Sequence, residues 1–157
     1  MKKHILLFLI CISFYSCSTE LDKIRNSDDL VFLSKYVEKF TSECIDSNEE
    51  SLFKKYYFNE IDSTIIFYTG LTKSDFKEKW TIPLKKTIVS YNKNSKNMMW
   101  NEIEISGIGN SIYYEDSDSN KNEMINRFII YEYNWCKKSD QEKFEIALKR
   151  MIVISKK

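Results

Sequence analysis

Histidine is almost missing from this chain, because His4 is the only histidine among the 157 residues. Histidine supplies the base in Ser-His-Asp and Cys-His catalytic sites, and it is a common zinc ligand. Residues 5–157 therefore exclude all three kinds of site. The sequence also lacks a Walker loop, a G-x-G-x-x-G motif and a G-x-S-x-G motif, which leaves no local signature of a nucleotide-binding or hydrolase site.

Glycine, proline and arginine are scarce as well. With three Gly and one Pro, the chain is neither low in complexity nor proline-rich. Only three of the 24 basic residues are Arg, whose planar fork suits phosphate recognition, and the formal net charge is +1. The balanced charge gives no electrostatic footprint for nucleic acid, so we expect no nucleic-acid partner.

Long apolar runs are absent except for one near the N-terminus. Lys2 and Lys3 precede an apolar run over residues 5–15, and Ser16 and Cys17 follow it. About eleven residues are too few to cross a hydrocarbon core, but they suit the apolar region of a signal peptide. The small residue followed at once by Cys17 resembles the lipobox of bacterial lipoproteins, although Phe14 stands where that family usually has Leu.

The lipobox resemblance implies a signal peptide over residues 1–16, cleavage before Cys17 and acylation of that cysteine. Residues 17–27 would then be the lipidated cysteine and a polar tether. Two or more acyl chains hold a protein stably on a membrane without a transmembrane helix. We therefore expect a cell-envelope protein that is lipid-anchored to a membrane and exposed outside the cytoplasm. An ordinary secretory signal or an uncleaved N-terminal anchor is the alternative.

The remaining residues, 28–157, are expected to form one α+β domain. Apolar residues from Leu30 to Cys44 recur at helical spacing, which predicts an amphipathic helix over about 28–46. Capping-box patterns predict two shorter helices, from Ser47 to about Phe58 and from Thr72 to about Trp80. Strands are expected at about 63–68, 84–91, 98–108, 112–114, 123–136 and 142–155.

The expected order of elements, α-α-β-α-β-β-β-β, resembles the NTF2-like (cystatin-like cone) superfamily. The resemblance implies N-terminal helices packed on a curved antiparallel sheet of about five strands, which together enclose a pocket. In that superfamily the outer sheet face often forms dimers, so a homodimer is one expectation. Some members are enzymes and many only bind, so the fold alone implies no activity.

Arg150 lies in an apolar row of the last expected strand. In an antiparallel hairpin of 123–136 with 142–155, it would share the inner face with Glu132 and Asn126 and oppose Phe128. As a functional group, Arg150 would bind an anion inside the pocket, whose polarity Glu132 and Asn126 would set. The alternative, which we favour, is a structural ion pair or an Arg whose head lies in solvent, because a bare buried charge is very costly.

Two further features concern surfaces and cross-links. Tyr131, Tyr133 and Trp135 would share the other hairpin face, opposite Met151 and Val153, and would form either an interaction face or a surface covered by the same chain. The cysteines that remain after Cys17 are Cys44 and Cys136. They would form a disulfide in an oxidising compartment or stay as two buried thiols, and the sequence leaves both alternatives open.

The segment Asp116-x-Asp118-x-Asn120 resembles the first half of an EF-hand calcium loop. The second half does not fit, because Lys121 stands at the required Gly and Arg127 at the bidentate Glu. We therefore expect a solvated hairpin loop there, with no metal and no cofactor.

The function we expect is that of a membrane-anchored, non-catalytic domain that binds a protein partner or a small ligand. One alternative is an immunity lipoprotein that neutralises a toxin by occlusion. Another is an NTF2-like enzyme with a pocket carboxylate, for which Glu132 is the one candidate. Whether the chain is an enzyme stays open at this point, and the lack of histidine favours a binding protein.

Overall fold

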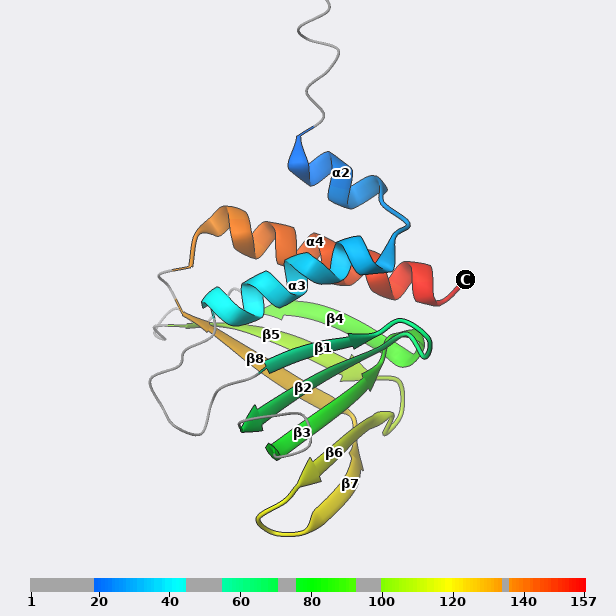
Figure 1. Ribbon diagram of the computed structural model, residues 1–157, viewed down its shortest axis with the longest axis vertical. Helices are drawn as coiled ribbons and strands as arrows, with labels where there is room; N and C mark the ends of the chain where they lie inside the picture. The colour runs from blue at the N-terminus through cyan, green and yellow to red at the C-terminus, as the bar shows by residue number, and fades with distance from the viewer. Residues whose placement is uncertain (1–18, 45–54, 71–75, 93–99, 134–135) are drawn as a thin grey trace, which may run out of the picture.

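Helices lie at both ends of the described chain, and strands lie between them (Figure 1). The computed structural model describes residues 19–44, 55–70, 76–92, 100–133 and 136–157. The α+β class is confirmed. The elements are α2 (Glu20–Asn26), α3 (Leu30–Cys44), β1 (Lys55–Asn59), β2 (Thr64–Gly70), β3 (Phe76–Pro83), the 3-10 helix η1 (Leu84–Lys86), β4 (Thr87–Asn92), β5 (Trp100–Gly107), β6 (Ile112–Asp116), β7 (Lys121–Ile125), β8 (Arg127–Tyr133) and α4 (Lys138–Ser155).

The strands form two antiparallel sheets, one with the order β1-β2-β3-β6-β7 and the other with the order β4-β5-β8. The chain passes between the sheets three times: through η1, over residues 108–111 and at Asn126. The Asn126 carbonyl accepts a hydrogen bond from the Gly107 amide at 2.8 Å. The inner faces meet where the Phe128 ring lies 5.0 Å from Phe67 and 5.1 Å from Trp80. These aromatic rings form the centre of the core between the sheets.

Helices α3 and α4 lie side by side along one side of the two sheets (Figure 1). Helix α3 contacts the edge strand β1, and α4 contacts η1 and the edge strand β4. The rings of Phe40 and Phe144 stack between the helices, with 4.2 Å between their centroids. The helix pair therefore bridges the edges of the two sheets and buries an apolar stripe that neither helix would hide alone.

The expected strand over 142–155 is wrong, because Lys138–Ser155 is helix α4. Its buried side chains recur every three or four residues, as at Phe144, Ala147 and Met151, which is the spacing of one helix face. The expected hairpin is therefore absent. β8 pairs with β5 instead, so Phe128 opposes Ile105 rather than Arg150.

Four other local expectations need correction. The helix expected to end at Phe58 is wrong over its last residues, which form β1, and its earlier part lies outside the described residues. The helix expected to end at Trp80 is likewise replaced by β3 from Phe76 onward. The polar segment 17–27 contains helix α2, whose Ile24 is fully buried, so the packed unit begins near Thr19 rather than at Asp28. A bend at Asn126 also divides the strand expected over 123–136, since β7 ends at Ile125 and β8 begins at Arg127.

Candidate functional site

Arg150 and Asn126, two of the three expected pocket residues, are not brought together. The Nε of Arg150 donates to the carbonyl of Ser27 at 2.9 Å, and its Nη2 pairs with the Asp28 carboxylate. Asn126 is exposed at the bend between β7 and β8. The side chain of Glu132, in β8, lies outside the described residues. Arg150 is therefore a structural group that fastens α4 to the connection between α2 and α3.

The expected hairpin face is not formed either. Met151 is fully buried in α4, whereas Val153 on the same helix is half exposed, so they do not share a strand face. The side chains of Tyr131 and Tyr133, and the whole of Trp135, lie outside the described residues. The interaction face assigned to these three aromatic residues stays a prediction.

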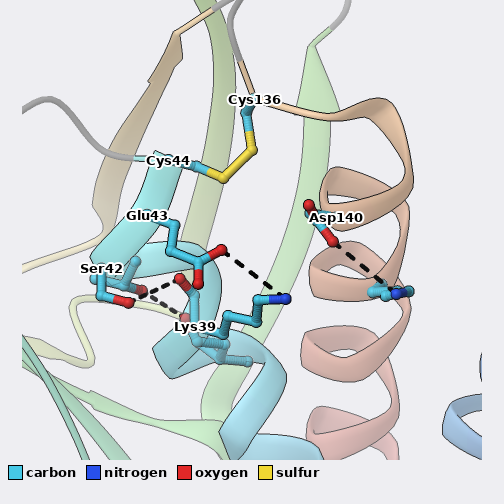
Figure 2. The surroundings of a disulfide bond; sticks show 9 residues. Lys39, Ser42, Glu43, Cys44, Cys136 and Asp140 are labelled. Atoms are coloured by element: carbon cyan, nitrogen blue, oxygen red, sulfur yellow. Dashed lines mark hydrogen bonds and ion pairs between the residues drawn. A yellow bond between two sulfur atoms is a disulfide. The ribbon is translucent and has the colours of Figure 1, made fainter.

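Cys44 and Cys136 are joined in a disulfide (Figure 2). Cys44 is the last residue of α3, and Cys136 precedes α4, with 5.3 Å between their Cα atoms and 92 positions between them in the chain. The bond closes a loop that contains most of both sheets. Of the two alternatives that the sequence left open, the structure therefore has the cross-linked one.

The Asp116 segment is a hairpin loop, as expected. The Asp116 carboxylate accepts hydrogen bonds from the Asp118 amide at 2.9 Å and from the Ser119 hydroxyl at 2.6 Å. Asn120 follows with a φ of 51°, a left-handed conformation that Asn tolerates. The hydrogen bond from the Ser119 hydroxyl has the largest effect in holding the pKa of Asp116 below its ordinary value. Hydrogen bonds from the Ser119 and Asp118 amides lower this pKa further. The carboxylate is thus engaged in the turn.

A polar cluster links α2 to the helix pair. The Nζ of Lys143 contacts the Glu20 carboxylate at 2.5 Å, and the Tyr36 hydroxyl donates to Glu20 at 3.2 Å. The hydrogen bond to Lys143 is the first cause that lowers the pKa of Glu20, and the same bond raises the pKa of Lys143. Because these groups satisfy one another around a gap of only about 40 Å³, the cluster is structural.

The outer face of the five-stranded sheet carries a row of side chains that crosses every strand, and the row is exposed on β1, β6 and β7, half-buried at Thr81 and buried at Ile66. Neighbours in the row are register partners on adjacent strands. Tyr57 is 42% exposed, Tyr113 is 37% exposed and Met124 is 48% exposed. The full row, called the sheet-face row below, is Tyr57, Ile66, Thr81, Tyr113 and Met124. The sequence analysis missed it because it placed Tyr57 in a helix.

A cleft of about 250 Å³ lies between α3 and β1, at the Tyr57 end of the sheet-face row. Its lining combines aromatic rings, two carboxylates and a hydroxyl, and none of the described residues that line it is Lys or Arg. We call it the α3–β1 cleft. Its lining includes Ser34, Glu38, Tyr56, Tyr57, Phe58 and Glu60.

Tyr56 places a buried hydroxyl against this cleft. The hydroxyl makes no hydrogen bond of ordinary geometry to any described residue, because the neighbouring Ser34 hydroxyl donates to the Val31 carbonyl at 2.9 Å. Burial is the main cause that raises the pKa of Tyr56 well above its ordinary value. The Ser34 hydroxyl lowers this pKa by less than burial raises it, and the charge of Glu38 raises it a little further. The hydroxyl therefore stays protonated, with its oxygen free to accept a hydrogen bond.

Comparisons with known proteins assign no function to this chain, so its function is argued from its own residues. No family model, no curated protein and no solved structure matches the chain. Among the helices that the structure describes, none has both the length and the apolar character of a membrane-spanning segment. Within the same residues, no three His, Cys, Asp or Glu side chains gather as metal ligands would. Among the described residues, the sheet-face row and the α3–β1 cleft are therefore the candidate binding sites.

Proposed function

We propose that this chain is a lipid-anchored, non-catalytic protein whose domain binds a protein partner outside the cytoplasm through the outer face of its five-stranded sheet. The observation that carries the proposal is the sheet-face row. Tyr and Met are enriched at protein interfaces, where they supply large contact areas. Single exposed apolar side chains are normal on a surface, but Tyr113 and Met124 are register partners on neighbouring strands and form one exposed patch, with Tyr57 exposed at the other end of the row.

The position of the helices supports the use of this face. Helices α3 and α4 contact β1, β4 and η1 at the sheet edges, and they lie away from β3, β6 and β7 (Figure 1). Tyr113 and Met124 therefore lie on strands that no described helix covers. A partner would reach them without any rearrangement of the domain.

The packed interior also favours a surface over an internal pocket. Phe67, Trp80 and Phe128 occupy the space between the two sheets, where an NTF2-like cone would hold a ligand. Arg150, the cation expected in such a pocket, is engaged by Ser27 and Asp28 outside it. An enzyme built around these residues is therefore not what we propose.

Two features support a place outside the cytoplasm. The disulfide between Cys44 and Cys136 is of a kind that persists in oxidising compartments. The lipobox-like segment that ends at Cys17 would supply the anchor. Helix α2 begins two residues after Ser18, so the packed domain would lie close to the membrane surface.

The test places a photo-cross-linking amino acid at position 113 of the full chain in living cells. We expect one discrete partner to be cross-linked, and its affinity for the protein to fall at least about tenfold in Tyr113→Ala and Met124→Ala. Ile88, 55% exposed on the other sheet, is the matched control for both the cross-linker and the Ala substitution. Equal cross-linking from positions 113 and 88, or equal affinity of all three variants, would contradict the proposal.

A further inference from the structure

The α3–β1 cleft has the chemistry of a cation site. Its lining includes the carboxylates of Glu38 and Glu60, one from the helix and one from the end of β1. Neither carboxylate forms a salt bridge with any residue that the structure describes. The cleft therefore has a local negative charge in a protein whose net charge is close to zero.

The other lining groups also suit a cation. Tyr56, Tyr57 and Phe58 all line the cleft, and the electron-rich face of an aromatic ring attracts a cation. Because side chains alternate along β1, the rings of Tyr56 and Phe58 share one face of the strand, and the Tyr57 ring lies on the other. The Ser34 hydroxyl donates its proton to the Val31 carbonyl, so its oxygen keeps a lone pair at the cleft, whereas the Tyr56 oxygen is buried behind the lining. Carboxylates, aromatic rings and a hydroxyl oxygen together match a group that carries several N–H donors and one positive charge.

We propose that the α3–β1 cleft binds an alkylammonium group, supplied by a Lys side chain of the protein partner. The volume supports a group of this size, because about 250 Å³ is below the range of pockets that enclose drug-sized ligands. The apolar stem of a Lys would lie along the rings, and its ammonium would meet the carboxylates. An anion or a carboxylate ligand is disfavoured, because it would face Glu38 and Glu60, and none of the described residues that line the cleft is Lys or Arg.

Tyr57 connects this site with the sheet-face row, since it lines the cleft and begins the row. A partner that covers the whole row, from Met124 on β7 to Tyr57 on β1, would therefore reach the cleft. The chemistry of the cleft stands by itself, and only the source of the ammonium group rests on the proposed function.

The first test uses the full chain in a non-ionic detergent and two small probes, N-acetyl-lysine amide and N-acetyl-norleucine amide. Norleucine has a similar stem without the charge, so it is the control for apolar binding. We follow the amide signals of Val31, Tyr56 and Glu60 by NMR during each titration. We expect the titrations to give a Kd for the lysine probe that is at least about tenfold lower than that for the norleucine probe. The Kd of the lysine probe should rise at high salt, because salt screens the charges.

Variants on helix α3 give the matched comparison. Glu38→Gln removes a lining carboxylate, whereas Glu43→Gln removes an exposed carboxylate on the same helix outside the cleft. We expect Glu38→Gln to weaken the lysine probe about tenfold and Glu43→Gln to leave it unchanged. Equal affinity of the two probes, or an equal effect of the two variants, would overturn the site.

The source of the ammonium group is read separately. If Glu38→Gln weakens capture of the cross-linked partner as well as the lysine probe, the partner supplies the Lys. If it weakens only the probe, a free amine is the ligand, and the assignment to a partner's Lys is overturned. Loss of capture in Tyr113→Ala with normal binding of the lysine probe supports the sheet face as the partner surface and the cleft as an ammonium site. Normal capture in Tyr113→Ala with normal binding of the probe overturns the sheet face alone, so the failures of the two proposals are distinguishable.

Discussion

Arg150 and Ser27 are 123 positions apart in the chain and are joined by one hydrogen bond, from the Arg150 Nε to the Ser27 carbonyl at 2.9 Å. The same guanidinium pairs with the Asp28 carboxylate. One side chain near the end of α4 thus holds the connection through which α2 enters α3. The contact explains how a charge is retained beside an apolar helix face, because its donors are satisfied at the rim of the core.

Arg150→Leu should lower the free energy of unfolding by about 1–2 kcal/mol, measured by urea denaturation. The Arg150 side chain is only 27% exposed, so loss of its bond to the Ser27 carbonyl is not fully replaced by water. Lys149→Leu is the control, because Lys149 is 51% exposed and makes a single i,i+4 pair with Glu145. That change should cost no more than about 0.5 kcal/mol. Equal effects of the two substitutions would show that Arg150 is not a structural group.

The Cys44–Cys136 disulfide should contribute about 4.6 kcal/mol in the chain-entropy model, since the two cysteines are 92 positions apart. The variant Cys44→Ala with Cys136→Ala should therefore unfold at lower urea concentration than the oxidised protein. A reductant should lower the urea midpoint of the wild type and leave that of the double variant unchanged. A wild-type midpoint that does not respond to the reductant would contradict the cross-link.

Tyr56 and Tyr114 should respond in opposite ways to loss of the hydroxyl. The Tyr114 hydroxyl donates to the Glu78 carboxylate at 2.8 Å, so Tyr114→Phe should cost about 1–2 kcal/mol of stability. The Tyr56 hydroxyl is buried without a hydrogen bond to a described residue, so Tyr56→Phe should leave stability unchanged or raise it by up to about 1 kcal/mol. Thermal unfolding measures both. A larger loss in Tyr56→Phe than in Tyr114→Phe would contradict the environments described above.

The sequence predicted those elements whose signal is local. Leu33, Val37 and Phe40 recur at helical spacing, and all three are buried on α3. The β-branched and aromatic run that ends at Gly70 likewise forms β2 over Thr64–Gly70. In both segments the residues that carry the pattern are also the residues that the tertiary structure buries, so local and global preferences agree.

Helix α4 was predicted wrongly because its apolar face is wide. Ile146 and Ile154 are partly buried beside the main stripe, so the even-numbered apolar residues of the segment imitate a strand. Ala147 and Met151, which are apolar, four residues apart and both buried, are the residues of this segment whose spacing favours a helix. The helix is wide-faced because it packs on α3 as well as on η1 and β4, and that arrangement is set by tertiary contacts.

The candidate site was beyond local prediction for a different reason. The sheet-face row joins Tyr57 to Met124 through three intervening strands, and only the strand order and register place these residues on one line. A shift of one residue in any strand would move its member to the inner face. The α3–β1 cleft likewise depends on how the helix meets the edge of the sheet, which no spacing within either element specifies.

The contact between Glu20 and Lys143 should be visible in the pH dependence of stability. The pKa of Glu20 is lowered from 4.5, so its contribution is present above pH 4.5 and is lost as the pH falls through the lowered value. The pKa of Lys143 is raised from 10.5, so its contribution is present below pH 10.5 and is lost at higher pH. Glu20→Gln should therefore flatten the loss of stability between about pH 5 and 3, measured by urea denaturation.

Lys143→Met provides the check on that assignment, because it removes the partner and leaves Glu20 in place. Each single variant should reduce the loss of stability between about pH 5 and 3, and the double variant should reduce it no further than either single variant does. Additive effects of the two substitutions would mean that Glu20 and Lys143 titrate independently.

Cys17 should be the acylated residue of the chain if the N-terminal segment is a lipoprotein signal. In cells fed an alkyne-labelled fatty acid, the full chain should take up the label, and Cys17→Ala should lose it. Cys11→Ala is the matched control and should keep the label, because the bulky Ile10 stands before Cys11 where the lipobox has a small residue. Since two or more acyl chains are needed for stable attachment, Cys17→Ala should also lose stable lipid anchoring. Retention of the label in Cys17→Ala would leave the domain without the proposed anchor, whereas the sheet-face row and the α3–β1 cleft would keep their own tests.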